Sequence, residues 1–410
     1  MVDILIIGAG AAGVAAGLRL AGAPLDLLIV EAAARPGGRA HSVSLDGMCL
    51  DLGCGWLHSA DRNPWAGLAE AQGVEIDRTP PAWRSQFADL GFTPAEQKAA
   101  HDAFAEFGRR LREAPPASDR ASDAMPPGDA WNCYLEALSG FMNGAELEQL
   151  SVTDFLAYDE ADSGVNWRLP GGYGAFIAAQ AAALPIRFET PIEEIDRSGP
   201  LLKARGPAGE IEARAVIVTV PTEMLARERL RFTPPLGDKL DAAQRLPLGL
   251  ANKAFLGLDR PDPFEADTQM LGNPKDPGTG AYYLCPFGRP AIECFFGGAG
   301  ARALEAEGEG AALDFAVSQL VALLGSDMRR RLRPLAESRW GAEPLAMGSY
   351  SHALPGQAGA RAVLAAPVED RIFFAGEACS AVDFSTAHGA FETGERAALS
   401  AMNSLGRKGL

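Results

Sequence analysis

The sequence predicts an α/β protein in which a nucleotide-binding domain is interrupted by a second domain. Two observations predict this class: a strand–turn–helix–strand unit opens the chain, and a second strand–helix unit lies at residues 371–398. The sequence between the two units has a different character, with polar helical stretches and β-rich stretches. At 410 residues the chain exceeds one ordinary domain, which fits two domains or one large interleaved unit.

The first unit contains two short apolar segments on either side of a helical segment. Residues 2–7 (VDILII) have the length and composition of a strand, and residues 25–32 (LDLLIVEA) predict a second buried strand. Residues 14–23 (VAAGLRLAGA), between them, are rich in alanine and leucine and favour a helix. This order predicts a βαβ unit with a parallel pair of strands.

Three glycines lie between the first strand and the helix. Gly8, Gly10 and Gly13 form the pattern G-x-G-x-x-G. The first permits a tight turn, the second lets the backbone approach a pyrophosphate, and the third allows close packing of helix and strand, so that phosphates lie at the helix N-terminus. Glu31 ends the second strand, where its carboxylate can accept hydrogen bonds from ribose hydroxyls. The segment therefore predicts dinucleotide binding.

The residues after Glu31 favour a flavin dinucleotide over a nicotinamide one. Arg35, Gly37, Gly38 and Arg39 follow in the segment EAAARPGGRAHSV. A flexible glycine pair that brings arginine towards a diphosphate suits a large, permanently bound nucleotide. Taken alone, the same residues would fit an ordinary exposed loop.

The interior of the chain changes character several times. Residues 66–160 are helical and more polar, and the Pro/Ser/Asp-rich residues 114–129 within them predict a mobile loop. Residues 186–221 are β-rich. Residues 228–340 mix strands with one strong helix at 310–325. These changes of character indicate that a second domain interrupts the nucleotide-binding one.

The charge and the cysteines restrict the class of partner. The chain has 37 Lys and Arg against 53 Asp and Glu, a formal net charge of −16, so it lacks the basic surplus that binding a nucleic-acid backbone needs. An acidic surface favours cationic small molecules, or it simply keeps the protein soluble. The six cysteines show no C-x-x-C pair, and the five histidines show no paired spacing, so we expect reduced thiols and no metal site.

The expected location is the cytoplasm. No basic segment precedes the first apolar run, so a signal peptide is not predicted. No apolar run approaches the length that crosses a membrane, so no membrane partner is expected.

Six blocks of the sequence resemble the flavin-dependent amine oxidases, the family of the monoamine oxidases, polyamine oxidases and lysine-specific histone demethylases. The blocks follow the family's order and are RPGGRAHSV (35–43), DLGCGWLHSADRNPW (51–65), LPGGYGAFIAA (169–179), AVIVTVPTEML (215–225), SRWGAEPLAMGSYS (338–351) and RIFFAGEACSAVDFSTAHGAFETGERAA (371–398). The first two and the last are the most distinctive. The resemblance is weak over residues 75–160.

The resemblance implies an amine oxidase fold. A Rossmann-like FAD-binding domain is expected from residues 1–70, 164–228 and 338–410, and an interleaved α+β substrate-binding domain from residues 71–163 and 229–337. We expect the active site between the two domains, against the flavin ring.

A lysine inside an apolar segment is the first predicted catalytic residue. Lys253 lies in the run LPLGLANKAFLGL, where an unpaired buried ammonium would be costly. In the family a lysine of the substrate-side domain holds a water against flavin N5, and LANKAFLGL stands at the matching place. We expect burial to depress the pKa of Lys253. The alternative is a strand-edge lysine whose ammonium reaches solvent.

The segment GSYS and the last block supply further site residues by resemblance. Ser349 stands where some monoamine oxidases carry the cysteine that bonds to flavin, so FAD is expected to be non-covalent. Tyr350 corresponds to one wall of the family's aromatic cage, where it would steer an amine, or it is a core tyrosine. Thr386 replaces the second tyrosine of the cage, as in the histone demethylases. A half-open cage suits a longer, thinner substrate than a small aromatic amine.

Three more site residues are assigned by resemblance. His58 matches a histidine of the polyamine oxidases near the substrate amine, whereas Gly55 stands where several of them carry an acidic residue. Gly376 and Glu377 match a flavin-contacting segment, although Glu377 could also cap a helix. Arg39, in the RPGGRAHSV block, is also expected to bind the cofactor.

An acidic cluster precedes the LPGGYG block. Asp159, Glu160 and Asp162 either line the mouth of a substrate tunnel and attract cations, or form a solvated loop. Histidines 101, 352 and 388 have no assigned chemistry: the first is expected to be solvated, and the other two to pack locally.

The resemblance implies oxidation of a C–N bond by FAD. Hydride would pass from the carbon next to an unprotonated amine to flavin N5, water would hydrolyse the imine, and O2 would reoxidise the flavin to give hydrogen peroxide. A polyamine or other alkylamine is the expected substrate, and a homodimer is left open. The alternatives are a C–C desaturase or protoporphyrinogen-oxidase-like enzyme, an L-amino-acid oxidase, and a non-catalytic flavin-binding scaffold.

Overall fold

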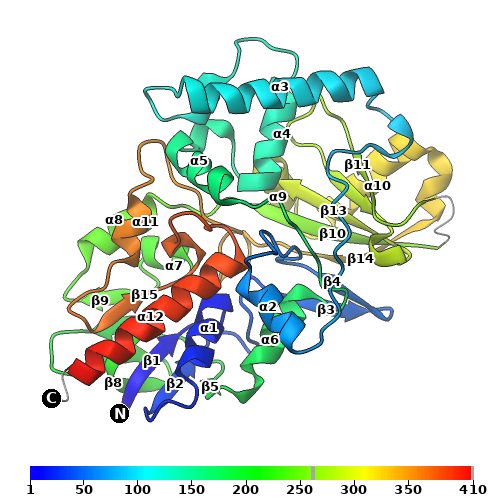
Figure 1. Cartoon of the computed structure of the whole chain (residues 1–410). Helices are drawn as coiled ribbons and strands as arrows, with labels where there is room; N and C mark the ends of the chain where they lie inside the picture. The colour runs from blue at the N-terminus through cyan, green and yellow to red at the C-terminus, as the bar shows by residue number, and fades with distance from the viewer. Residues whose placement is uncertain (260–263, 408–410) are drawn as a thin grey trace.

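The computed structural model describes residues 1–259 and 264–407, which form two main β-sheets with helices packed against them (Figure 1). Within these residues, eight strands belong to the first sheet and five to the second. Parts of two predicted segments, residues 260–263 and 408–410, lie outside the described residues. The α/β class is confirmed.

The N-terminal unit has the predicted order. Strand β1 (Val2–Ile7) pairs in parallel with β2 (Leu27–Val30), and helix α1 (Ala11–Leu20) connects them. On its other side β1 pairs in parallel with β8 (Gly209–Val218), which also pairs in parallel with β15 (Ile372–Phe374). The first and last thirds of the chain therefore meet in one parallel sheet.

The remaining strands of the first sheet lie on either side of these parallel strands. One edge is formed by β5 (Ile186–Arg187), beside β2. The other is an antiparallel extension of β8 through β7 (Leu202–Gly206) and β6 (Glu194–Asp196), with β9 (Arg231–Thr233) outermost. This extension places a β-rich layer beside the nucleotide-binding strands.

Both faces of the parallel sheet are covered. Alternate residues of β1 point to opposite faces, so that Ile4 and Ile6 lie in one apolar core while Leu5 and Ile7 lie in another. Helices α1 and α12 (Ala387–Arg407) pack together on the first of these faces, near the two chain termini (Figure 1). Helices α7 (Thr222–Ala226), α8 (Gly237–Gln244) and α11 (Ala360–Ala365) cover the second face.

The second sheet holds the segment with the unusual lysine. Strand β10 (Ala251–Leu258) lies between β13 (Ala291–Gly297) and β14 (Leu332–Glu337), and all eight of its residues are buried. The sheet continues outwards through β12 (Ala281–Leu284) and β11 (Thr268–Leu271). Helices α9 (Gly298–Glu307) and α10 (Ala311–Leu324) pack against it.

Three helices form a separate layer on the side of the molecule away from the two chain termini (Figure 1). They are α3 (Pro94–Glu113), α4 (Asn132–Asn143) and α5 (Val152–Ala161). A capping box fixes the start of α3: the Thr93 hydroxyl accepts from the Glu96 backbone N–H, and the Glu96 carboxylate accepts from that of Thr93. The remaining elements that frame the centre are β3 (Ser42–Leu45), β4 (Met48–Asp51), α2 (Pro64–Ala71) and α6 (Tyr173–Gln180).

The loop at residues 114–129 is anchored rather than free. It contains a short 3-10 helix, Ala121–Ala124, with both end residues buried. The Ala121 N–H donates to the Leu150 carbonyl at 3.0 Å, and the Asp119 carboxylate accepts from the Thr153 N–H at 2.9 Å. The proline and serine content correctly predicted an irregular backbone. It did not predict the hydrogen bonds that hold this segment to Leu150 and Thr153.

The boundaries of the two domains remain a prediction, and the structure differs from them at one point. Strand β9 and helix α8 fall within predicted segment 229–337, yet β9 pairs with β6 and α8 packs on the core of the first sheet. Among the described helices, none is both long enough and apolar enough to cross a membrane.

Candidate functional site

A large cavity is lined by residues of both main sheets. Its volume is about 1170 Å³, which exceeds the ~300–1,000 Å³ typical of a pocket for one small molecule. Ten of the eleven site residues predicted from sequence line it: Gly8, Gly10, Glu31, Arg39, His58, Lys253, Tyr350, Gly376, Glu377 and Thr386. The eleventh, Gly13, is not among the residues that line it. Residues far apart in the sequence therefore converge on one space with room for a cofactor and a substrate.

The glycine turn forms one end of this cavity. Gly8 has φ of +107°, a backbone conformation that favours glycine. A Cβ atom at Gly13 would lie 1.9 Å from the Gly8 carbonyl oxygen, so only glycine permits this approach of helix and strand. Gly37, with φ of +99°, donates its N–H to the Ala9 carbonyl at 2.8 Å. The turn and the arginine loop are therefore joined, and the N–H groups that begin α1 face the same space.

Glu31 is fixed at the end of β2. Its carboxylate accepts from the Ala9 N–H at 2.7 Å and from the Ala33 N–H at 2.8 Å. Each oxygen of an ionised carboxylate can accept a second hydrogen bond, so the group remains suited to a diol such as a ribose. This geometry fits the predicted role.

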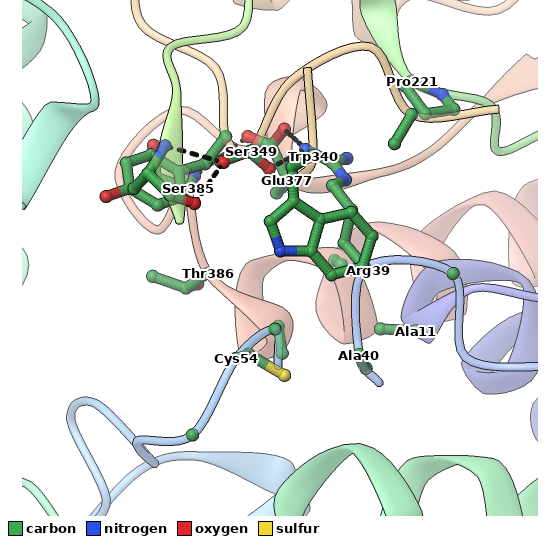
Figure 2. Close-up of a pocket in the computed structure, with 18 of the residues that line it drawn as sticks. Ala11, Arg39, Ala40, Cys54, Pro221, Trp340, Ser349, Glu377, Ser385 and Thr386 are labelled. Atoms are coloured by element: carbon green, nitrogen blue, oxygen red, sulfur yellow. Dashed lines mark hydrogen bonds and ion pairs between the residues drawn. The ribbon is translucent and has the colours of Figure 1, made fainter. Parts of the chain in front are cut away.

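Arg39 and Glu377 form a charged pair in the cavity wall. The Arg39 Nη1 atom donates to Glu377 Oε1 at 2.9 Å and to the Ser349 carbonyl at 2.7 Å. Burial alone would raise the pKa of Glu377, but Arg39 and the Ser351 hydroxyl outweigh burial and hold that pKa below its usual value. Figure 2 shows the pair beside Ser349 and Trp340.

These residues fit FAD as the bound group. A helix N-terminus without a capping side chain suits the pyrophosphate, the acid at the end of β2 suits the ribose, and the arginine supplies positive charge. Ser349 uses its hydroxyl on the backbone of β10: it accepts from the Ala251 N–H at 2.8 Å and donates to the Ala251 carbonyl at 2.7 Å.

Lys253 is buried on β10 and paired with an acid. Its Nζ atom lies 2.7 Å from Glu293 Oε1, and its side chain is 9% exposed. The predicted depression of its pKa is wrong: burial lowers the pKa, but Glu293 and Asp51 outweigh burial and raise it above the ordinary value. The alternative of an ammonium that reaches solvent is also wrong. The site therefore holds a charged lysine.

Tyr350 and Thr386 are rigid parts of the wall. The Tyr350 hydroxyl donates to the Phe141 carbonyl at 2.7 Å, which fixes the ring where it lines the cavity. Thr386 precedes α12 and caps it, because its hydroxyl accepts from the Gly389 N–H at 3.0 Å and donates to the Asp383 carbonyl at 2.7 Å. Tyr350 and Thr386 therefore make local hydrogen bonds that stabilise the structure, and they also line the cavity as predicted.

His58 has one nitrogen bonded and the other available. Its Nδ1 atom lies 2.6 Å from Asn166 Oδ1, and the Asn166 amide nitrogen donates to the Gly164 carbonyl at 3.0 Å. The second bond orients the amide, so Oδ1 must accept and Nδ1 must carry the proton. Burial lowers the pKa of His58 below its usual value. The ring is therefore neutral at pH 7, with an unprotonated Nε2.

Several residues that line the cavity were not predicted. The rings of Trp56 and Trp83 meet with centroids 4.9 Å apart, and Tyr283 lies 6.0 Å from Trp56. Trp56 lies inside the GWLHS block and could have been found there, whereas Trp83 falls where the resemblance is weak. Glu293 is a charge in an apolar strand, the same signal that drew attention to Lys253.

The acidic cluster reaches the cavity only in part. Asp159 and Asp162 line it, although Asp159 is paired with Arg112 at 2.5 Å. Glu160 is exposed. His101 also lines the cavity from α3, which the expectation of a solvated residue did not include. In the described part of the chain, no group of three or more His, Cys, Asp or Glu side chains is arranged to hold a metal ion.

His388 and His352 lie outside this chemistry. His388 Nε2 lies 3.0 Å from Asp383 Oδ1, a local contact at the start of α12. His352 is buried, neither ring nitrogen has a hydrogen-bond partner in the described structure, and burial together with Arg361 lowers its pKa to about 4. His352 is therefore neutral in the folded protein and costly to protonate.

Replacing His352 should remove an acid-sensitive element of stability. As pH falls from 6.5, the unfolded chain takes up a proton on this residue that the folded chain does not, so stability is lost progressively down to about pH 4. We expect the free energy of unfolding of His352→Leu, relative to that of wild type, to be about 2 kcal/mol more favourable to the folded state at pH 5 than at pH 7. Urea unfolding followed by circular dichroism at both pH values measures this difference, with His352→Phe as the variant of closer volume. If the difference in unfolding free energy between His352→Leu and wild type is the same at pH 7 and pH 5, the prediction is wrong.

Comparisons with known proteins bear directly on this site. A family model described as flavin containing amine oxidoreductase matches residues 63–401, and one described as NAD(P)-binding Rossmann-like domain matches residues 6–70. Polyamine oxidase 4 of Oryza sativa subsp. japonica is 30% identical, over 97% of this chain and 88% of that protein. Lysine-specific histone demethylase 1 homolog 2 of the same organism is 27% identical, and the match covers 97% of this chain and 56% of that protein.

Solved structures show the same fold. A putrescine oxidase bound to putrescine superposes with a TM-score of 0.79 at 20% sequence identity, over 98% of this chain and 99% of that one. A double mutant of putrescine oxidase gives a TM-score of 0.78 at 19% identity, with the same coverage. The predicted two-part architecture is therefore the fold observed in those enzymes.

Proposed function

The chain belongs to the family of flavin-containing amine oxidoreductases, and we propose that it oxidises a polyamine or another extended alkylamine. It is an FAD-dependent enzyme that acts on an amine, and its FAD is non-covalent. When bound, FAD accepts a hydride from the carbon that carries the amine. The proposal adds the substrate class, the roles of four residues, and O2 as the final electron acceptor.

The observation that carries the proposal is the convergence of the four residues on the cofactor cavity. His58, Lys253, Tyr350 and Thr386 come from separate parts of the chain, and all four line the space that also contains the glycine turn. Each is held by a defined partner, so the cavity wall is rigid before substrate arrives. This pre-organised set supports catalysis within the cavity.

His58 would prepare the amine for oxidation. An alkylamine is mostly an ammonium at pH 7, since an unperturbed primary amine such as lysine has a pKa of about 10.4. Only the neutral amine can release a hydride from the neighbouring carbon. The unprotonated Nε2 of His58 can accept the ammonium proton, while Asn166 keeps Nδ1 protonated.

Lys253, Tyr350 and Thr386 would act on the remaining steps. The Lys253 ammonium has N–H donors beyond the one used by Glu293, and these can hold the water that attacks the imine. The Tyr350 ring and the smaller Thr386 would form the two sides of the approach path. In balance, the amine, O2 and water give an aldehyde, the released amine and hydrogen peroxide.

The shape and charge of the cavity support an extended cationic substrate. The cavity continues from the glycine turn to residues of the helical layer, including His101 on α3 and Asp162 at the end of α5. Trp56 and Trp83 present aromatic surface on the way, which attracts alkylammonium groups. The cytoplasmic location and the homodimer stay predictions.

A chain-length series tests the substrate class. We expect kcat/KM to rise from butylamine through putrescine to spermidine, with an increase of about tenfold or more in at least one of the two steps. The reason is that each additional ammonium group can reach the aromatic and acidic wall of the cavity. Peroxide-coupled initial rates measure the series, with benzylamine and leucine as comparison substrates. Highest activity on benzylamine or leucine would reject the extended-amine proposal.

A further inference from the structure

Lys253 keeps a charge in a place where burial opposes it. It lies on a central strand whose residues are all buried, and transfer of an ammonium into such a site favours the neutral amine. Two carboxylates oppose this tendency, those of Glu293 on β13 and Asp51 at the end of β4. Their surroundings differ, and this difference identifies which of them governs the lysine.

Asp51 is committed to the start of helix α6. Its carboxylate accepts from the Tyr173 N–H at 3.0 Å, from the Gly174 N–H at 3.1 Å and from the Ser42 hydroxyl. These donors satisfy much of its hydrogen-bonding capacity and hold the carboxylate in place. Asp51 therefore acts on Lys253 as a nearby charge rather than as a bonded partner.

Glu293 is bonded directly to the lysine. Among the described residues it alone forms an ion pair with Lys253, through Oε1 at 2.7 Å. Lys253 and Glu293 lie on adjacent antiparallel strands, where Phe255 is opposite Glu293 and Phe295 is opposite Lys253. Both charged side chains line the cavity. Two neighbouring strands thus bring the pair together diagonally on one face of the sheet.

Gly55 leaves the space that the ammonium occupies. A Cβ atom at this position would lie 2.9 Å from Lys253 Nζ and 3.4 Å from the Asp51 Cβ. The absence of a side chain therefore allows the lysine head to approach the protein wall between the two acids. This arrangement gives a reason for glycine at a position where an acid was the expectation from resemblance.

We propose that Glu293 is the positioning residue of Lys253: its carboxylate holds the lysine ammonium against Gly55, so that the lysine acts as a hydrogen-bond donor and not as a base. One of the three N–H donors is used by Glu293, and the others remain for water. The inference rests on the proposed function only in one respect, which is that the water held by Lys253 attacks the imine.

The groups that face Lys253 are consistent with a permanently charged lysine. Glu293 approaches from β13, and Asp51 approaches from β4. Cys54 is half-buried, and the pKa of its thiol is raised to about 12, by desolvation first and by Asp51 second, so the thiol is neutral at pH 7. His58 is neutral there as well. The two acids therefore determine the charge of the lysine.

A lysine titration by NMR tests the proposal without measuring turnover. The chain contains six lysines, so a spectrum of protein labelled with 13C at the lysine Cε should be simple, and Lys253→Met assigns the signal. In the FAD-loaded wild type we expect Lys253 to stay charged at least to pH 10. In Glu293→Gln we expect its titration midpoint to fall by about one pH unit or more. Tyr283→Phe, opposite Glu293 on β12, is the matched control and should leave the midpoint unchanged.

Two results would overturn the proposal. One is a Lys253 midpoint that is the same in Glu293→Gln and in wild type, and the other is a neutral Lys253 in wild type at pH 8. If Glu293→Gln fails to fold, Lys253→Met in the same chain should restore folding by removing the unpaired charge, and an unfolded double variant would equally reject the proposal. A protein that oxidises no amine but shows the shift would reject the proposed function while supporting the positioning role.

Discussion

Arg39→Ala should strip the protein of FAD and lower its stability. Arg39 supplies positive charge to the cofactor cavity and bonds to both Glu377 and the Ser349 carbonyl. Without it, the buried Glu377 carboxylate keeps its backbone and hydroxyl donors and the more remote charge of Arg361, but loses its directly bonded counter-charge. Because Arg39 is itself partly exposed, we expect a cost of about 2 kcal/mol in the free energy of unfolding, below the ~3–5 kcal/mol of a fully buried pair. FAD affinity should fall about a hundredfold.

A double-variant cycle separates these two effects. Glu377→Gln removes the charge that Arg39 compensates, so the combination Arg39→Ala/Glu377→Gln should recover most of the lost stability but little of the lost FAD affinity. Thermal unfolding of the apoprotein gives the first quantity, and fluorescence titration with FAD gives the second. If Arg39→Ala retains FAD like wild type, Arg39 has no part in cofactor binding. If the double variant is no more stable than the single one, the ion pair does not carry the stability.

His58→Leu should slow amine oxidation strongly at neutral pH and only weakly at high pH. The neutral imidazole accepts the substrate proton in this account, and such proton transfer is typically worth ~10²–10⁴-fold. We therefore expect kcat/KM to fall at least about a hundredfold at pH 7. Near pH 10 much of the amine is already neutral in solution, so the gap to wild type should shrink to about tenfold or less.

The pH profile distinguishes this role from a loss of packing. Burial lowers the pKa of His58, so wild-type kcat/KM should decline on the acid side only below pH 6.5, where the ring gains a proton and can no longer accept one. Asn166→Asp would place a carboxylate next to the Nδ1–H group, raise the pKa of His58 and move that decline to higher pH. FAD absorbance checks that each variant keeps its cofactor. A deficit in His58→Leu that is equal at pH 7 and pH 10 would argue against proton acceptance.

The parts of the fold set by local patterns could be predicted from the sequence. The run at residues 2–7, the three glycines and the acid at Glu31 specify a strand, a tight turn and a strand end within a short stretch, and the structure has each of them there. Six of the ten predicted residues that line the cavity lie in the ordered blocks, and local propensity did not indicate that they would converge: Arg39, His58, Tyr350, Gly376, Glu377 and Thr386. Motif order carries long-range information that composition does not.

The errors arose where distant residues determine local properties. The apolar run around Lys253 correctly indicated burial, but its pKa depends on Glu293 and Asp51, which other strands supply. The prolines of residues 114–129 indicated irregular backbone, but Asp119 attaches this segment to Thr153 through tertiary contacts. Trp83 belongs to a stretch without family motifs, so nothing local marked it as part of the cavity.

The most direct test is an anaerobic spectral titration of the purified holoenzyme with spermidine, putrescine, benzylamine and leucine. We predict that spermidine or putrescine bleaches the oxidised flavin spectrum, and that admitting air restores the spectrum with formation of hydrogen peroxide. A flavin spectrum that none of the four compounds changes would contradict the proposed oxidation of an extended alkylamine.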